Sequence, residues 1–116
     1  MLFKNQSVPK FEESCPMGGK GELTLDKPSS LGCLPAGSVA TFARATLAPG
    51  AEVGFHIHKG DSEAYYFLSG EGEYDDGGVT YKVSAGDFSY TADGEGHGVK
   101  NVTDEPLVFI AIIFKS

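Results

Sequence analysis

Short strand-like runs separated by turn residues constrain the fold of this 116-residue chain more than any other feature. Sixteen glycines and six prolines interrupt it, and no stretch keeps the apolar period of an amphipathic helix. Many short strands at near-regular spacing are typical of an all-β sandwich, jelly roll or barrel. We expect strands over residues 22–26, 39–47, 52–58, 63–68, 72–75, 79–83, 87–91, 97–102 and 107–114.

The length fits one domain. Residues 1–21 are less regular than the rest, so we expect an N-terminal arm that packs on the barrel or on a second subunit. Residues 22–116 are expected to form the single barrel domain. The Gly18-Gly-Lys-Gly segment lacks the spacing of a phosphate-binding P-loop and is interpreted as a turn.

The charge balance argues against several classes of partner. With a net charge of −7 and only nine Lys plus Arg, the chain has no basic stripe for nucleic acid and little attraction for anionic membranes. No apolar run reaches the length of a membrane span, and the first residues lack the apolar core of a signal peptide. A cytoplasmic location is the expectation. Cys15 and Cys33 are then expected as free thiols, with a disulfide between them as the alternative.

The three histidines of the chain, His56, His58 and His97, are the first candidates for chemistry. In a strand, the spacing of His56 and His58 places both imidazoles on one face. A turn between His58 and Glu63 resets the strand phase, so Glu63 can face the same interior. An inward carboxylate is costly unless it is paired or bound to a metal. For the two strand histidines alone, ordinary barrel-lining polar residues remain the alternative.

The spacing around these residues resembles the two motifs of the cupin superfamily, G(x)5HxH(x)3,4E(x)6G and G(x)5PxG(x)2H(x)3N. The chain reads Gly50-x5-His56-x-His58-x4-Glu63-x6-Gly70 and then Gly86-x5-Ala92-x-Gly94-x2-His97-x3-Asn101. All three histidines fall on motif positions. Of the named positions, only the proline is replaced, by Ala92, and we expect this change to loosen the turn before His97 slightly.

The resemblance implies a double-stranded β-helix, or jelly roll, with one metal held by His56, His58, Glu63 and His97. Three imidazoles and one carboxylate suit a divalent transition metal: Fe, Mn, Ni, Co, Cu or Zn. Four protein ligands on an octahedral ion would leave two adjacent positions open. The positive site should attract an anionic small molecule. The chain looks closest to small bacterial RmlC-like cupins described as oxalate-decarboxylase-like or dioxygenase-like.

Several further residues are candidates for the pocket. Aromatic side chains on strands line a core or a pocket, and hydroxyls there need polar partners. Glu95, beside His97, is a candidate proton carrier. Arg44 could clamp a substrate carboxylate, although its alternation with apolar neighbours favours an outward position at an ion pair or interface. The aromatic candidates are Tyr65, Phe67, Phe88 and Tyr90.

Three classes of function remain open. The first is a metal-dependent decarboxylase or dioxygenase acting on a small organic acid or oxygenated compound. The second is a non-enzymatic, metal-dependent binding or sensor module. The third is metal-free sugar isomerase or epimerase chemistry, against which the intact ligand set argues. The run from Leu107 to Phe114 is apolar on both strand faces, so we also expect a homodimer that covers its outer face.

Overall fold

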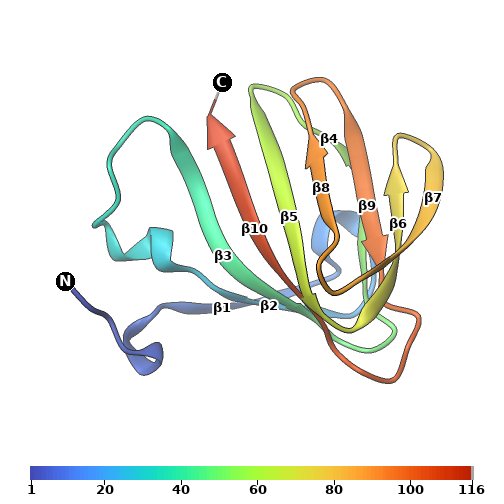
Figure 1. The fold of residues 1–116 in the computed structure, drawn as a ribbon, viewed down its shortest axis with the longest axis horizontal. Helices are drawn as coiled ribbons and strands as arrows, with labels where there is room; N and C mark the ends of the chain where they lie inside the picture. Colours follow the sequence, from blue (N-terminus) through green and yellow to red (C-terminus); the bar gives the residue numbers. More distant parts are fainter. Residues whose placement is uncertain (116) are drawn as a thin grey trace.

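The computed structural model describes residues 1–115, which form two facing antiparallel sheets (Figure 1). One sheet has six strands in the order β1-β2-β3-β10-β5-β8, and the other has four in the order β4-β9-β6-β7. The expected all-β jelly roll is confirmed. The strands are β1 (Lys10–Ser14), β2 (Glu22–Asp26), β3 (Val39–Leu47), β4 (Glu52–Ile57), β5 (Asp61–Ser69), β6 (Glu71–Asp76), β7 (Val79–Ser84), β8 (Phe88–Thr91), β9 (Gly96–Lys100) and β10 (Leu107–Lys115).

The helical segments of residues 1–115 are three short 3-10 turns. No helix within residues 1–115 combines the length and apolarity needed to cross a bilayer. The turns are η1 (Asn5–Ser7), η2 (Pro16–Gly18) and η3 (Pro28–Leu31).

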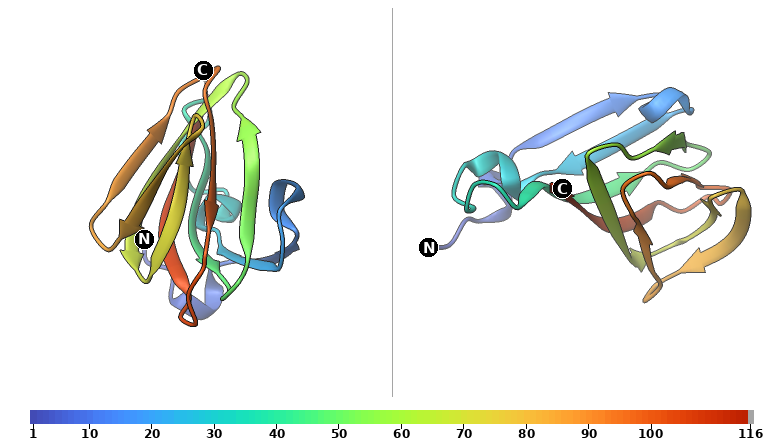
Figure 2. Two further views of the ribbon diagram at one scale, coloured as in Figure 1. Left: turned by 90° about the vertical axis from the view of Figure 1, so that its right-hand side faces the viewer. Right: turned by 90° about the horizontal axis from the view of Figure 1, so that it is seen from above.

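Strand β1 lies within the segment that the sequence suggested was irregular. Its residues pair antiparallel with β2, from Lys10 opposite Asp26 to Ser14 opposite Glu22, and Figure 2 shows the pair extending beyond the barrel. The sequence of β1, KFEES, has no alternation of apolar and polar residues, so no pattern marked this strand. The structure agrees, because all five residues are exposed. Backbone pairing defines it, and its charged side chains suit the edge of a sheet.

The core lies between the two sheets, where alternate residues of each strand point inward. In β3 the inward set is Ala43, Ala45 and Leu47, while Arg44 points out, as the apolar pattern indicated. Phe67 of β5 and Phe109 of β10 fill the centre, with ring centroids 5.4 Å apart.

The outer face of the six-stranded sheet is also apolar. Ile110 and Ile112 of β10 are only half-buried, and they lie beside exposed aromatic side chains of β5 and β8 such as Tyr66 and Phe88. The homodimer expected from the apolarity of β10 stays a prediction, and this is the face that it would cover. Cys15 and Cys33 are both free and exposed.

Candidate metal centre

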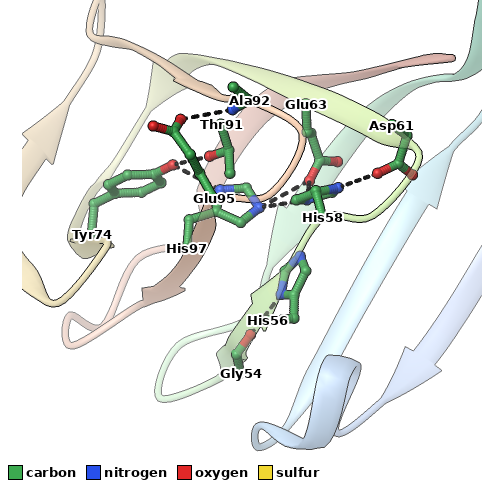
Figure 3. A network of polar contacts seen from close by, with 10 residues as sticks. All are labelled: Gly54, His56, His58, Asp61, Glu63, Tyr74, Thr91, Ala92, Glu95 and His97. Atoms are coloured by element: carbon green, nitrogen blue, oxygen red, sulfur yellow. Dashed lines mark hydrogen bonds and ion pairs between the residues drawn. The ribbon is translucent and has the colours of Figure 1, made fainter. Parts of the chain in front are cut away.

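The four residues of the expected ligand set lie together between the two sheets. One ligand atom from each of His56, His58, Glu63 and His97 falls within 4.8 Å of all the others (Figure 3). His56 of β4 stands directly opposite His97 of β9, Glu63 comes from β5 in the other sheet, and His58 follows the end of β4. The histidine and glutamate side chains converge from three strands and one turn.

A β-bulge in β4 aims His56 inward. Val53 pairs with Val99 and His56 pairs with His97, so β4 has one residue more than β9 between these two pairs. The extra residue lets Val53 and His56 share the inner face despite their odd spacing. Gly54 lies in this bulge, where an added Cβ would approach the Met17 carbonyl oxygen to 2.2 Å. Glycine is therefore required for the close approach of the two backbones.

Backbone hydrogen bonds between two turns position His58. Its N–H donates to the Glu95 carbonyl at 2.9 Å, and its carbonyl accepts from the Gly94 N–H at 2.7 Å. The turn after His58 resets the strand phase, so that Glu63 and Tyr65 both face the interior, as the sequence suggested. These hydrogen bonds connect the segment that carries His56 and His58 to the segment that carries His97, next to the cluster.

The partners of two histidines define which ring nitrogen is free. The Nδ1 of His56 lies 2.8 Å from the Gly54 carbonyl oxygen, and the Nδ1 of His58 lies 2.8 Å from the Asp61 carboxylate. A carbonyl and a carboxylate only accept hydrogen bonds, so both Nδ1 atoms carry the proton. With Nδ1 engaged in this way, Nε2 is the ring nitrogen that His56 and His58 each offer to a metal.

The histidine Nε2 atoms and a carboxylate oxygen of Glu63 bring several hydrogen-bond acceptors close together. Glu63 Oε1 lies 3.2 Å from His58 Nε2 and 3.1 Å from His97 Nε2. Burial also lowers the pKa of His56 below its ordinary value, which keeps this imidazole in the neutral form that binds metals. Converging buried acceptors require a cation or a proton among them. The cluster can therefore hold a metal ion, and its nitrogen and oxygen atoms suit a divalent transition metal.

A cavity of about 170 Å³ adjoins the cluster. Small side chains on β3 and β10 create it, because Ala43, Ala45 and Ala111 occupy inward positions where larger residues would fill the space. The walls are mainly apolar, and Tyr65 and Glu63 are among their polar groups.

The N-terminal segment closes one side of this cavity. Glu13, Pro16 and Met17 line it, and backbone hydrogen bonds between Lys20 and Glu52 tie the segment to β4. Cys15 and Met17 have φ values of 51° and 52°, in the left-handed region that non-glycine residues seldom adopt. A strained backbone of this kind is found where function constrains a segment. The sequence pattern gave no sign that this segment reaches the cavity.

Of the aromatic candidates, Tyr65 lines the cavity, and its ring centroid lies 4.9 Å from that of His97. Burial, and after it the charge of Glu63, raise the pKa of the Tyr65 hydroxyl well above its ordinary value, so the hydroxyl keeps its proton. Phe67 lies deeper, in the packed core. Phe88 and Tyr90 differ from expectation: they are 65% and 53% exposed on the outer face of β8, because Ser89 and Thr91 take its inner positions.

Arg44 and Glu95 have structural partners instead of a place in the cavity. The Arg44 guanidinium binds the Asp26 carboxylate on the outside of the sheet. The Glu95 carboxylate accepts the Ala92 N–H at 2.9 Å. Ala92 stands where the motif has proline, which carries no N–H, and Glu95 satisfies the donor that this replacement introduces. A side-chain hydrogen bond therefore closes the turn before His97, and the slight loosening expected from Ala92 stays a prediction.

Two residues that contact the histidines were missed in the sequence. Asp61 had a recognisable signal, since it lies three residues after His58, at the first position of β5. Tyr74 had none, because β6 brings it to His97 from a distant part of the chain, with its hydroxyl 2.7 Å from His97 Nδ1.

Known proteins resemble this chain along most of its length. An oxalate-binding protein from Thermotoga maritima is 35% identical over 113 residues, which cover 97% of this chain and 93% of that protein. Oxalate decarboxylase OxdC from Bacillus subtilis is 37% identical over 75 residues, 60% of this chain and 20% of that protein. The crystal structure of a predicted oxalate decarboxylase from Thermotoga maritima superposes with a TM-score of 0.87 at 33% identity, covering 100% of both chains.

The family model of the cupin domain matches residues 43–113, from the middle of β3 to two residues before the end of β10. The matched range contains the whole histidine and glutamate cluster and both motif segments. The chain therefore belongs to the cupin domain family.

Proposed function

We propose that this protein holds a divalent transition metal with His56, His58, Glu63 and His97, and binds a small dicarboxylate of the oxalate class beside it. One observation carries the proposal. Imidazole nitrogens whose tautomers are set by Gly54 and Asp61 converge with a buried carboxylate at the edge of a cavity. Such an arrangement is costly to bury unless a cation or a shared proton lies among the acceptors.

The size and lining of the cavity support a small acid as the ligand. Its volume of about 170 Å³ is below the range of about 300–1,000 Å³ typical of pockets for drug-sized molecules. The alanine-rich part of the wall offers no polar side chain, so carboxylate groups would bind toward the cluster and Tyr65. The relative from Thermotoga maritima, which matches nearly the full chain, is named as oxalate-binding.

The residues around the cluster have distinct tasks in this proposal. Asp61 and the Gly54 carbonyl orient two imidazoles, and the protonated Tyr65 hydroxyl is a donor at the cavity wall. The N-terminal segment restricts the access of water. A bound metal would supply the positive charge and the Lewis acidity that attract and polarise carboxylate oxygens.

Decarboxylation is the second candidate function. The reaction releases carbon dioxide and leaves a carbon atom that must take up a proton, so it needs an acid near the ligand. Glu13 supplies a carboxyl group on the cavity wall, and part of the chain resembles an oxalate decarboxylase. A dioxygenase would instead consume oxygen.

Metal analysis and calorimetry test the binding proposal. We expect one equivalent of divalent transition metal in the wild-type protein, oxalate binding only to the metal-loaded form, and loss of both in His58→Ala. Ala43→Leu is the matched variant, because it takes up cavity space and leaves all four cluster residues in the sequence: it should keep the metal and lose oxalate affinity. A wild-type protein that takes up no metal after reconstitution would contradict the proposal.

Product analysis separates binding from turnover. If the protein is a decarboxylase, metal-loaded protein given oxalate should release carbon dioxide and formate without consuming oxygen, and Glu13→Gln should bind oxalate but turn it over more slowly. Oxygen consumption would indicate oxidative chemistry. Binding with no product would leave the protein as a binding or sensor module.

A further inference from the structure

The buried hydroxyl of Tyr74 contacts a histidine of the cluster from behind. Tyr74 is 3% exposed, and its hydroxyl lies 2.7 Å from His97 Nδ1 and 3.2 Å from the hydroxyl of Thr91, which is 1% exposed (Figure 3). His97 itself is fully buried. The three side chains form a chain of hydrogen bonds from His97 through Tyr74 to Thr91 of β8, which stands opposite Glu63 of β5.

The partner of His97 differs in kind from the partners of the other two histidines. The Gly54 carbonyl and the Asp61 carboxylate can only accept, and this confines His56 and His58 to the tautomer protonated at Nδ1. The hydroxyl of Tyr74 can either donate or accept. His97 is therefore the one histidine of the three whose surroundings permit both neutral tautomers.

Without a metal, the tautomer protonated at Nε2 satisfies the cluster. His97 Nε2 lies 3.1 Å from Glu63 Oε1 and 3.1 Å from His58 Nε2. A proton on His97 Nε2 gives these two acceptors a shared donor where they would otherwise face each other unpaired. His97 Nδ1 then accepts a hydrogen bond from the Tyr74 hydroxyl.

To bind a metal, His97 must free Nε2 and carry its proton on Nδ1. The Nδ1–H then donates to the Tyr74 oxygen, and the Tyr74 hydroxyl turns to donate to Thr91. The proton from Nε2 leaves to water, Nδ1 takes the hydroxyl proton of Tyr74, and Tyr74 recovers one from water. Imidazole and phenol each hold the same number of protons before and after the exchange.

We propose that Tyr74, supported by Thr91, is a positioning residue that lets His97 exchange tautomers, so that the cluster is hydrogen-bonded when empty and open when a metal arrives. The inference rests on the proposed metal binding. It assigns distinct roles to the histidines: His56 and His58 are fixed ligands, and His97 is the adjustable one.

Nitrogen-15 NMR of histidine-labelled protein tests this in the wild type, where only three imidazoles contribute signals. In metal-free protein we expect His56 and His58 protonated at Nδ1 and His97 at Nε2. With one equivalent of zinc, all three should be protonated at Nδ1. A metal-free His97 already protonated at Nδ1, or at both nitrogens, would overturn the inference.

Tyr74→Phe keeps the ring and removes the hydroxyl, which leaves the Nδ1–H of zinc-bound His97 without its acceptor. We expect zinc affinity to fall by about 10–100-fold, as for other residues that orient metal ligands. Tyr81→Phe is the control. Tyr81 of β7 stands opposite Tyr74 of β6, but its side chain is exposed. Equal losses in the two variants, or no loss in Tyr74→Phe, would overturn the assignment.

The two proposals fail in different ways. Wild-type protein that binds no zinc would remove the proposed function itself. Wild-type protein that binds zinc, with His97 in one tautomer throughout, would remove only the role of Tyr74. If Tyr74→Phe does not fold, the wild-type NMR experiment still decides the question, and Thr91→Val provides a second variant with an expected smaller loss of affinity.

Discussion

The two ends of the barrel interior are built from the same strands but with opposite kinds of side chain. Along β3, the inward residues change from Ala43 beside the cavity to Leu47 at the far end, and along β10 they change from Ala111 to Leu107. Leu47 and Leu107 are fully buried and stand opposite each other. Small residues thus leave space at one end, and large ones close the other.

The strands that carry the cluster show the same gradient. Along β5 the inward residues run from Glu63 through Tyr65 to Phe67, and along β9 His97 is followed by Val99. Packed apolar side chains at the closed end supply the stabilising burial, while the open end holds polar groups that oppose it. Because the two tasks are separated in space, stability and metal binding should respond to different substitutions.

The largest effect on stability is expected at the closed end. Phe67→Ala removes a side chain that is fully buried against Phe109, and substitutions of this kind cost about 3–5 kcal/mol. Urea unfolding of metal-free protein measures the loss. The zinc stoichiometry of the folded variant should stay at one. A variant that unfolds like wild type but loses zinc would contradict the separation of the two ends.

At the open end, stability should depend on metal. A ligand that binds only the folded state at 100 times its dissociation constant adds about 2.7 kcal/mol to the free energy of unfolding. Zinc should therefore raise the midpoint of thermal unfolding of the wild-type protein, and a chelator should reverse the shift. Glu63→Gln removes the anionic member of the cluster and should abolish most of this gain. An equal zinc shift in Glu63→Gln would show that zinc stabilises the protein elsewhere.

Asn101 links the closed end to its loops. Its buried side-chain amide donates to the carbonyls of Leu47 and Glu105, at 3.0 Å and 2.8 Å, and its Oδ1 accepts from Thr103. Asn101→Ala removes the amide donor from the carbonyl of the fully buried Leu47 and one of the two side-chain donors to the Glu105 carbonyl, at a cost of about 1–3 kcal/mol in urea unfolding. Asn101→Asp keeps the acceptor for Thr103 but removes the donors, so most of the loss should persist. If Asn101→Asp has the same free energy of unfolding as the wild type, the stabilisation comes from the hydrogen bond with Thr103 instead.

The sequence predicted the strands and the cluster well for a physical reason. Turn residues mark the strand ends, and β2 and β3 begin and end where the pattern placed them. The grouping of His56, His58, Glu63 and His97 was implied by the resemblance to the cupin motifs. The spacing of His56 and His58 and the resetting of strand phase before Glu63 are local signals that agree with it, but nothing local joins His97 to the other three.

The pocket depended on information that is not local. In β8 the short alternating run fits either phase, and the structure turns Ser89 and Thr91 inward, which leaves Tyr90 outside. Tyr74 and Glu13 reach the site from other strands, and their neighbours in the sequence do not reveal this. The cavity itself exists because Ala43 and Ala111 are small. Small residues leave a cavity only where the neighbouring strands do not fill the space, and the sequence does not show which strands are neighbours.

The smallest effect is expected outside the barrel, at Arg44. Its side chain is 47% exposed and binds Asp26, so Arg44→Gln should cost less than about 1 kcal/mol at neutral pH. The hydrogen bond from Arg44 is the largest cause that holds the pKa of Asp26 below 3.8. A carboxyl group whose pKa is lower in the folded state stabilises the fold at pH values above its pKa in the unfolded state. This stabilisation is lost as the pH falls through its pKa in the folded state. The difference in urea unfolding between wild type and variant should therefore shrink below about pH 3.8.

Arg44→Gln also distinguishes the outside of β3 from its inside. Ala43 and Ala45 line the cavity, while Arg44 points to the opposite face of the sheet. Oxalate affinity of the metal-loaded protein, measured by calorimetry, should be the same in Arg44→Gln and wild type. A loss of tenfold or more would mean that Arg44 reaches the ligand, and it would place a carboxylate-binding group on the face that the structure assigns to an ion pair.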